Sequence, residues 1–127
     1  MNRHGFWGSR MPVFMVDDDA EILNSARFML EGEGYPVATF ESGRQLLAAL
    51  PAAKPCCIVI DYLLPDMTGL DACERLRALG VTAPVIIITG HPSPMIREKV
   101  QEAGLPLVEK PLVDELLSTI EAVGPLH

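Results

Sequence analysis

The feature that most constrains the fold is a regular alternation of short apolar runs with segments of helical periodicity. The apolar runs are rich in Val and Ile and occupy residues 13–16, 36–40, 57–60, 85–88 and 107–108. Runs this short, bounded by Pro, Gly or Asp, are typical of strands buried on both faces. Between and after them, apolar residues recur at 3.6-residue spacing over residues 22–30, 44–50, 70–79, 93–103 and 112–123. Five strand–helix units in strict alternation predict an α/β fold, a doubly wound five-stranded parallel sheet with five helices.

Length and charge limit the function classes. The 127 residues fit one domain, and the formal net charge of −7 weighs against direct nucleic-acid binding, which needs Lys and Arg to neutralise phosphates. The apolar stretches all fall short of the roughly 18 residues that a membrane-spanning helix needs. We therefore expect neither nucleic acid nor a membrane as a direct partner.

The cysteines and the chain ends bear on location and boundaries. Cys56, Cys57 and Cys73 are odd in number and suggest no pairing framework, so we expect a reducing, cytoplasmic compartment. Residues 1–10 lack the apolar core of a secretory signal. We expect residues 1–11 to be a flexible extension, residues 12–124 the domain, and residues 125–127 a short tail.

Polar side chains follow four of the predicted strands. In an open parallel sheet, ligands bind beyond the carboxyl ends of the strands. The residues at those ends are Asp17, Asp18, Asp19, Asp61, Thr89 and Lys110. Carboxylates, a hydroxyl and an ammonium group arriving at one edge form a more specific signal than any one of them.

Phosphoryl transfer explains this combination. Clustered carboxylates repel one another unless a cation neutralises them, and Mg²⁺ prefers oxygen ligands. Asp61 would then be the nucleophile that forms an aspartyl phosphate. The metal, the Lys110 ammonium and the Thr89 hydroxyl can each stabilise one of the charged phosphoryl oxygens.

Each residue also has a structural interpretation. Asp19 taken by itself is better explained as the N-cap of the following helix, and Asp61 could cap a turn. Thr89 could belong to a turn, and Lys110 could be a solvated surface side chain. Four such residues at four strand ends favour the functional interpretation.

The motifs then resemble those of the receiver domain of two-component response regulators. They are residues 16–19 (Val-Asp-Asp-Asp), 61–69 (Asp-Tyr-Leu-Leu-Pro-Asp-Met-Thr-Gly), 88–90 (Ile-Thr-Gly) and 109–111 (Glu-Lys-Pro). Ile-Thr-Gly-His with Glu-Lys-Pro is similar to the nitrogen-fixation-type regulators. Whether the chain is a stand-alone receiver or a truncated piece of a longer regulator stays open.

The resemblance implies a role for each matched position. It implies phosphorylation on Asp61, a Mg²⁺ site formed by Asp17, Asp18, Asp61 and the backbone carbonyl of Leu63, a switch hydroxyl on Thr89, and a phosphoryl-pairing ammonium on Lys110. It also implies a flavodoxin-like strand order 2-1-3-4-5 and, in many relatives, a cis bond before Pro111. The phosphoryl donor would be a sensor histidine kinase or a phosphotransfer protein, and a homodimer is possible. Such a receiver is a signalling phosphoacceptor and not an enzyme, although it assists its own phosphorylation and dephosphorylation.

Three positions depart from the family pattern or stand out within it. Leu107 occupies the place of the usual switch aromatic, and we expect it to pack in the core instead. Leu63 is apolar and could shield an acyl phosphate from water, so we hypothesise slow self-dephosphorylation. His91 lies in a proline-rich loop, where we expect it to be exposed to solvent.

Two other functions remain open on the sequence. Haloacid-dehalogenase-type phosphatases also place Asp-x-Asp after the first strand, as Asp17 and Asp19 do here, but the expected later acidic pair after the lysine is missing. A protein-interaction module that does not rely on phosphorylation is the second alternative, and the occupied catalytic positions weigh against it.

Overall fold

The predicted parallel sheet is present, with the predicted strand order. A computed structural model describes residues 11–50, 53–111 and 114–123, and within them the strands pair in the order β2-β1-β3-β4-β5, every pair parallel. The strands are β1 (Val13–Val16), β2 (Val37–Phe40), β3 (Cys57–Asp61), β4 (Val85–Thr89) and β5 (Leu107–Glu109). β3 and β4 each extend one residue past the predicted apolar run, so that Asp61 and Thr89 are the last residues of their strands.

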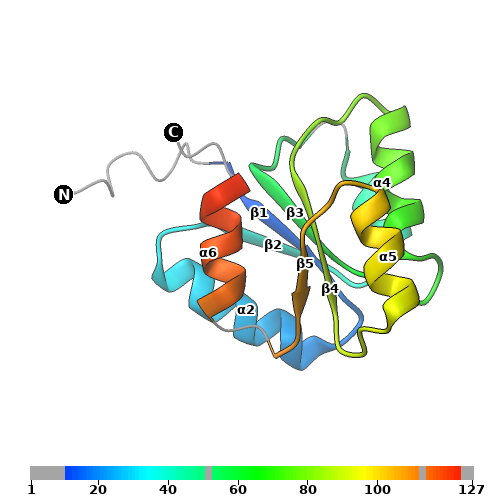
Figure 1. Cartoon of the computed structure of the whole chain (residues 1–127). Helices are drawn as coiled ribbons and strands as arrows, with labels where there is room; N and C mark the ends of the chain where they lie inside the picture. The colour runs from blue at the N-terminus through cyan, green and yellow to red at the C-terminus, as the bar shows by residue number, and fades with distance from the viewer. Residues whose placement is uncertain (1–10, 51–52, 112–113, 124–127) are drawn as a thin grey trace.

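Helices cover both faces of this sheet. They are α2 (Ala20–Gly32), α3 (Gly43–Ala48), α4 (Gly69–Ala78), α5 (Pro94–Glu102) and α6 (Asp114–Val123). α2 and α6 lie on one side of the sheet, and α4 and α5 lie on the other, as Figure 1 shows. The five predicted helices are confirmed, although α3 ends at Ala48, two residues before the predicted end.

Polar residues begin most of these helices. The side chains of Asp19, Ser42, Thr68 and Ser93 each accept a hydrogen bond from a backbone N–H in the first turn of α2, α3, α4 and α5, respectively. Such N-caps satisfy donors that the helix itself leaves unpaired, typically stabilising it by about 1 kcal/mol. The capping expectation for Asp19 is therefore confirmed.

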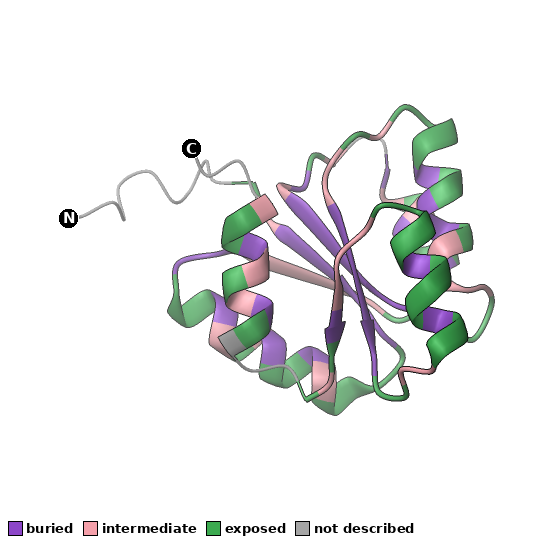
Figure 2. Cartoon of the chain, in the orientation of Figure 1, coloured by how far each residue is buried: buried purple, intermediate pink, exposed green. Residues whose placement is uncertain are grey.

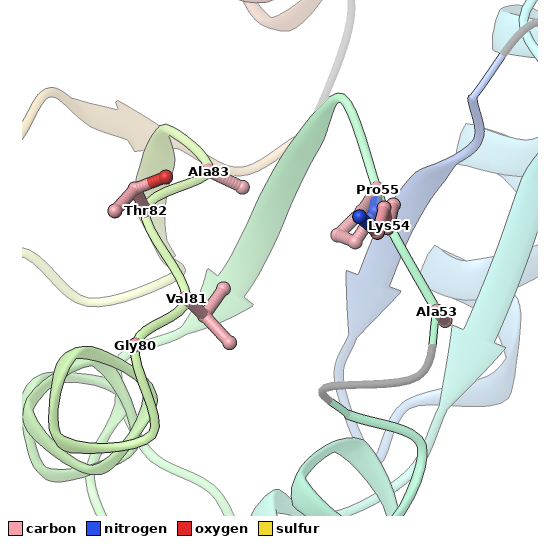
Figure 3. Close-up of a pocket in the computed structure, with 7 residues that line it drawn as sticks. All are labelled: Ala53, Lys54, Pro55, Gly80, Val81, Thr82 and Ala83. Carbon is pink, nitrogen blue, oxygen red and sulfur yellow. The ribbon is translucent and has the colours of Figure 1, made fainter.

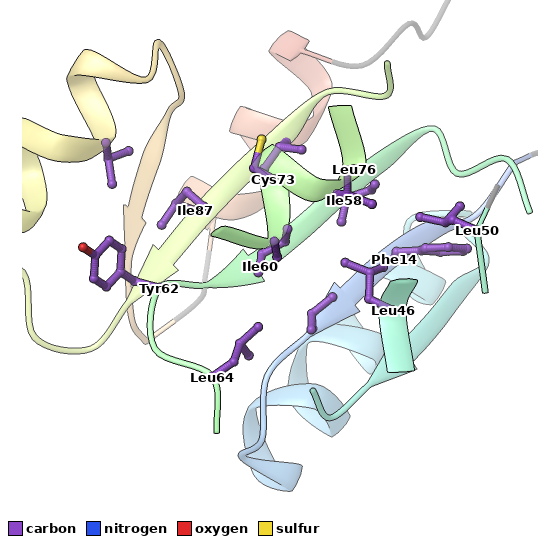
Figure 4. Packing of buried hydrophobic residues seen from close by; sticks show 14 of the residues in the cluster. Phe14, Leu46, Leu50, Ile58, Ile60, Tyr62, Leu64, Cys73, Leu76 and Ile87 are labelled. Atoms are coloured by element: carbon purple, nitrogen blue, oxygen red, sulfur yellow. The ribbon is translucent and has the colours of Figure 1, made fainter. Parts of the chain in front are cut away.

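Alternate residues of each strand point to opposite faces of the sheet and so pack into two separate hydrophobic cores. Phe14, Val16, Ile58 and Ile60 point towards α3 and α4, where they pack with Leu46, Leu76 and their neighbours (Figure 4). The alternate residues of the same strands pack against α2 and α6. Both faces are thus apolar, which explains why the central strands are continuous apolar runs. Figure 2 shows β1, β3 and β4 buried, the edge strand β2 partly buried, and the outer helix faces exposed.

The strand order determines where a site can form. From β1 the sheet continues to β2 on one side and to β3 on the other. The helices after β1 and β3 therefore pack on opposite faces, and in folds of this kind ligands bind beyond the carboxyl ends of two such strands. Asp17 follows β1 directly, and Asp61 is the last residue of β3.

None of the helices in the described ranges is long and apolar enough to cross a membrane. Of the predicted terminal segments, residues 1–10 and 125–127 lie outside the described residues, and Met11 is exposed.

Candidate functional site

Strand register brings the predicted residues to one edge of the sheet. Val16 of β1 pairs with Ile60 of β3, so Asp17 and Asp61 come next to each other on adjacent strands. Thr89 of β4 pairs with Glu109 of β5, and Lys110 follows immediately. The predicted convergence of four strand ends is therefore present in the fold.

Three carboxylates form a compact cluster. Asp17, Asp18 and Asp61 each offer an oxygen within 4.8 Å of the others. Asp17 is fully buried and Asp61 is 7% exposed, whereas Asp18 is open to solvent. Oδ1 of Asp17 accepts a hydrogen bond of 3.0 Å from the backbone N–H of Asp19, which fixes the orientation of its carboxylate.

Lys110 reaches into this cluster. Its Nζ lies 2.8 Å from Oδ2 of Asp17 and 3.3 Å from Oδ2 of Asp61. Its backbone N–H donates to the carbonyl of Thr89 at 2.9 Å, and the bond between Lys110 and Pro111 is cis. Burial would lower the pKa of Lys110, but its contact with Asp17 and the charge of Asp61 raise the pKa above its usual value. The side chain is therefore a permanent cation facing two carboxylates.

The environment of Asp61 makes its ionisation costly. Burial and the neighbouring charge of Asp17 raise the pKa of Asp61 from 3.8 to about 6, although Lys110 and a backbone hydrogen bond from Leu63 act in the opposite direction. One ammonium group does not fully compensate for two adjacent carboxylates. At neutral pH most of the Asp61 population is nonetheless ionised, which leaves an anionic oxygen at the end of β3.

The cluster fits a divalent cation. Three carboxylates opposed by the single ammonium of Lys110 leave two negative charges when all are ionised, the charge that one Mg²⁺ balances. Oδ2 of Asp17 is buried and lies close to Lys110, yet it makes no hydrogen bond of regular geometry. Oxygen donors of this kind match the preference of Mg²⁺, and a bound cation would compensate the repulsion that raises the pKa of Asp61.

Thr89 stands beside the cluster with a hydroxyl that is able to donate. The residue is 4% exposed, and its Oγ1 accepts a 3.2 Å hydrogen bond from the backbone N–H of His91. Because that bond uses a lone pair, the hydroxyl hydrogen stays available to a ligand. A Cβ at Gly90 would lie 3.6 Å from Cδ of Lys110, an ordinary van der Waals contact, so the close packing there does not require glycine. His91 itself is exposed, as predicted.

The loop after Asp61 is held close to the site. The backbone N–H of Gly69 donates to the carbonyl of Tyr62 at 2.7 Å, and a Cβ on Gly69 would lie 2.6 Å from the carbonyl oxygen of Asp61. Only glycine allows the start of α4 to approach the strand end this closely. Leu63 is 62% exposed beside the site. Leu107, for which packing in the core was predicted, is partly buried and packs against the hydrophobic core.

Asp19 does not join the acidic cluster. Its carboxylate accepts hydrogen bonds from the backbone of Glu21 and Ile22 at 2.9 and 3.4 Å and so begins α2. The Asp-x-Asp pair of the phosphatase alternative is therefore divided, with Asp17 in the site and Asp19 in a helix cap. Sequence reasoning also missed Asp66, whose carboxylate binds the backbone of a distant helix.

A separate hollow lies at the opposite edge of the sheet. This cavity of about 340 Å³ lies between the segments that lead into β3 and β4. Figure 3 shows Lys54 and Pro55 on one side of it and Val81 and Thr82 on the other. The residues lining it include no carboxylate. The chemistry therefore concentrates at the carboxyl edge of the sheet.

Comparison with known families gives a match over most of the chain. Residues 13–121 match the response regulator receiver domain. The chain belongs to the response regulator receiver family. It is thus a phosphoacceptor signalling domain rather than an enzyme in the usual sense, and its acidic pocket is formed by Asp17, Asp18 and Asp61.

Individual relatives agree with this assignment. The transcriptional regulatory protein FixJ of Bradyrhizobium diazoefficiens is 30% identical over 109 residues, covering 85% of this chain and 53% of that protein. A CheY-like receiver domain protein from Methanospirillum hungatei superimposes with a TM-score of 0.80 at 30% identity, covering 89% of this chain and 92% of the other. The beryllofluoride-activated NtrC4 receiver domain, a dimer, gives a TM-score of 0.81 at 30% identity, covering 89% and 95%. The chain spans about half the length of the curated FixJ relatives it matches.

Proposed function

We propose that this receiver acts in the cytoplasm and accepts a phosphoryl group on Asp61 from a phosphohistidine of a sensor histidine kinase or phosphotransfer protein. Receiver domains accept phosphoryl groups from histidine kinases. The observation that carries the assignment to Asp61 is its position at the end of β3, next to Asp17 and in contact with Lys110. We assign the domain to residues 12–124.

The transfer itself needs an unprotonated, accessible oxygen. An oxygen of Asp61 attacks the phosphorus, and the phosphorus–nitrogen bond breaks with its electron pair going to the imidazole nitrogen of the donor. The imidazole leaves as a neutral group if its other nitrogen already carries a proton, and otherwise takes a proton from solvent. With a pKa of about 6, Asp61 supplies this oxygen at neutral pH.

Asp18, Asp61 and the backbone carbonyl of Leu63 would hold Mg²⁺ directly, and Asp17 would support it through a water molecule. The ion supplies charge neutralisation at the phosphoryl oxygens. Asp17 is buried, and the backbone N–H of Asp19 already binds one of its oxygens, so its carboxylate is held in one orientation.

Lys110 and Thr89 would bind the product. After transfer, Lys110 can leave its contact with Asp61 and pair with a phosphoryl oxygen through the same ammonium group. The free hydroxyl hydrogen of Thr89 would donate to another oxygen. Since Leu107 cannot swing an aromatic ring, any signal from Thr89 would have to pass through the β4–α5 loop or the partly buried contacts of Leu107. A second copy of the chain is a candidate output partner, by analogy with the NtrC4 receiver domain dimer.

A phosphodonor assay tests this function. The protein is mixed with Mg²⁺ and acetyl phosphate, and mass spectrometry then locates an acid-stable, base-labile phosphoryl adduct. The adduct is expected on Asp61, and it should be missing from Asp61→Asn and much reduced when EDTA removes the metal. Absence of any adduct under saturating donor, or an adduct on Asp17 instead, would overturn the proposal.

A further inference from the structure

The loop between β3 and α4, residues 62–68, folds on itself and is attached to α4. The backbone N–H of Leu64 donates to the carbonyl of Met67 at 3.0 Å, and Leu63 forms an antiparallel bridge with Thr68. Thr68 and Asp71 form a reciprocal capping box at the start of α4. These contacts are all local and do not determine how the loop lies against the rest of the domain.

Asp66 supplies a long-range attachment. Its Oδ1 accepts from the backbone N–H of Gly43 at 3.0 Å, and its Oδ2 accepts from the backbone N–H of Arg44 at 2.9 Å. Both donors belong to the first turn of α3, more than 20 residues earlier in the sequence. Partial desolvation of the carboxylate raises its pKa, but these two hydrogen bonds outweigh that effect and hold the pKa of Asp66 below its usual value. Asp66 is thus a charged, bidentate link between the loop and a helix.

Met67 adds a packing contact to the same link. A Cβ built on Gly43 would lie 2.5 Å from Sδ and 2.7 Å from Cγ of Met67, closer than van der Waals contact allows. The absence of a side chain at Gly43 therefore lets the Met67 side chain lie directly over the start of α3. Two successive loop residues, Asp66 and Met67, meet the same turn of the same helix.

The other side of this loop faces the acidic cluster. Leu63 lies two residues after Asp61, and its backbone donates a hydrogen bond to the Asp61 carboxylate. Its side chain is 62% exposed, so packing of that side chain contributes little to holding the backbone in place. The buried side chains of Tyr62 and Leu64 hold the backbone on either side of Leu63, and the backbone N–H of Tyr62 donates to the carbonyl of Ile88 at 2.8 Å. The link through Asp66 holds the far end of the same loop.

We infer that Asp66 is a positioning residue for the metal site, which holds the Leu63 backbone against Asp61 by attaching the loop to the start of α3. The inference rests on the proposed function, in which the Leu63 carbonyl is a ligand of Mg²⁺. Asp66 does not touch the ion; it restricts the loop that carries a ligand. Removing a partner that orients a metal ligand typically weakens metal binding by about 10- to 100-fold.

The test measures Mg²⁺ affinity by isothermal titration calorimetry in the intact protein at pH 7.5. Asp66→Ala is expected to raise the Kd for Mg²⁺ about tenfold, the lower end of the usual range, because the contact is indirect. Asp66→Asn keeps one accepting oxygen and should give an intermediate Kd. The matched control is Ser42→Ala, which removes the cap that Ser42 provides to Gln45 in the same helix without touching the loop. Its Kd should stay within about twofold of wild type.

Gly43→Ala disturbs the link from the helix side. It leaves Asp66 unchanged and favours the helix intrinsically, but it forces Met67 away. We expect a raised Kd for Mg²⁺ in a protein that melts no lower than Ser42→Ala, and partial recovery of the affinity in Gly43→Ala/Met67→Ala. This variant also keeps the inference testable should Asp66→Ala fold poorly.

The outcomes separate the two proposals. If wild type binds Mg²⁺, Asp61→Asn does not, and the Asp66 variants match wild type, the positioning role is wrong while the metal site stands. If Ser42→Ala weakens Mg²⁺ binding as much as Asp66→Ala, the effect comes from α3 stability and the inference also fails. If wild type itself binds no Mg²⁺, the proposed metal site is what fails.

Discussion

Replacing Asp61 by asparagine should stabilise the protein at neutral pH in the absence of metal. The folded structure holds the Asp61 carboxylate in a buried position beside Asp17, and both features raise the pKa of Asp61 to about 6. Ionising this group therefore costs free energy in the folded state that is not spent in the unfolded state. Asparagine has the same shape and carries no charge, so it removes that penalty.

The magnitude follows from the pKa difference. A rise from 3.8 to about 6 is roughly 2.2 pH units, and at about 1.36 kcal/mol per unit the ceiling is about 3 kcal/mol. Lys110 loses one of its two carboxylate partners in the variant, and the site lies at a solvent-facing edge, so part of this gain is offset. We expect the free energy of unfolding to increase by about 1–2 kcal/mol at pH 7.5, which corresponds to a Tm higher by roughly 4–8 °C.

The pH dependence has a definite sign. Because the pKa of Asp61 is higher in the folded state, the folded state binds more protons between about pH 4 and pH 6. The contribution of Asp61 to wild-type stability is therefore fully present below about pH 4 and is lost as the pH rises through about 6. The advantage of Asp61→Asn should vanish at pH 4, where the wild-type carboxyl is largely protonated.

Urea denaturation in EDTA at pH 4.0, 6.0 and 7.5 measures this difference directly. Wild type and Asp61→Asn should have equal m-values and should diverge in midpoint only as the pH rises. Adding Mg²⁺ at pH 7.5 should then stabilise wild type more than the variant, because binding to the folded state adds to its stability. A variant that is no more stable than wild type at pH 7.5, or equally more stable at pH 4.0, would refute the electrostatic argument.

Three further predictions concern other parts of the molecule. Asp19→Ala should cost about 1 kcal/mol by removing the cap of α2 while leaving Mg²⁺ affinity unchanged, and a lost affinity measured by calorimetry would place Asp19 in the metal site. The fully buried thiol of Cys57, whose pKa burial raises to about 12, should resist iodoacetamide in the native protein and react only in urea; rapid native alkylation detected by mass spectrometry would contradict the buried position. Leu63→Asn should shorten the lifetime of the phosphorylated protein, because a polar side chain admits water that leucine excludes, and a longer lifetime in a phosphate-release assay would contradict the shielding role.

Local sequence patterns were sufficient for the fold class and for grouping most of the site, whereas the strand order was predicted only through the resemblance to the receiver family. Strands buried on both faces must be continuously apolar, so the runs that became β1, β3 and β4 were visible without any structure. Parallel strands bring their carboxyl ends to one edge, so polar residues at those ends had to meet. Asp17, Asp61 and Lys110 could therefore be grouped from their positions after the apolar runs.

Tertiary structure decided what depends on register and on contacts between distant segments. The sequence favoured Asp19 as a helix cap but did not distinguish Asp17 from Asp18 by burial, whereas the fold buries Asp17 completely and leaves Asp18 open to solvent within the same cluster. The raised pKa of Asp61 likewise depends on the pairing of β1 with β3.

Asp66 illustrates the same limit. Before the structure it was one more polar loop residue, because its partners on α3 lie more than 20 positions away in the sequence. Local periodicity reports which face of an element is buried, but it carries no information about which distant backbone groups a loop carboxylate will meet. The sequence by itself determined which residues meet at the site, and the packing of α3 and α4 on the sheet decided how the loop beside Asp61 is held.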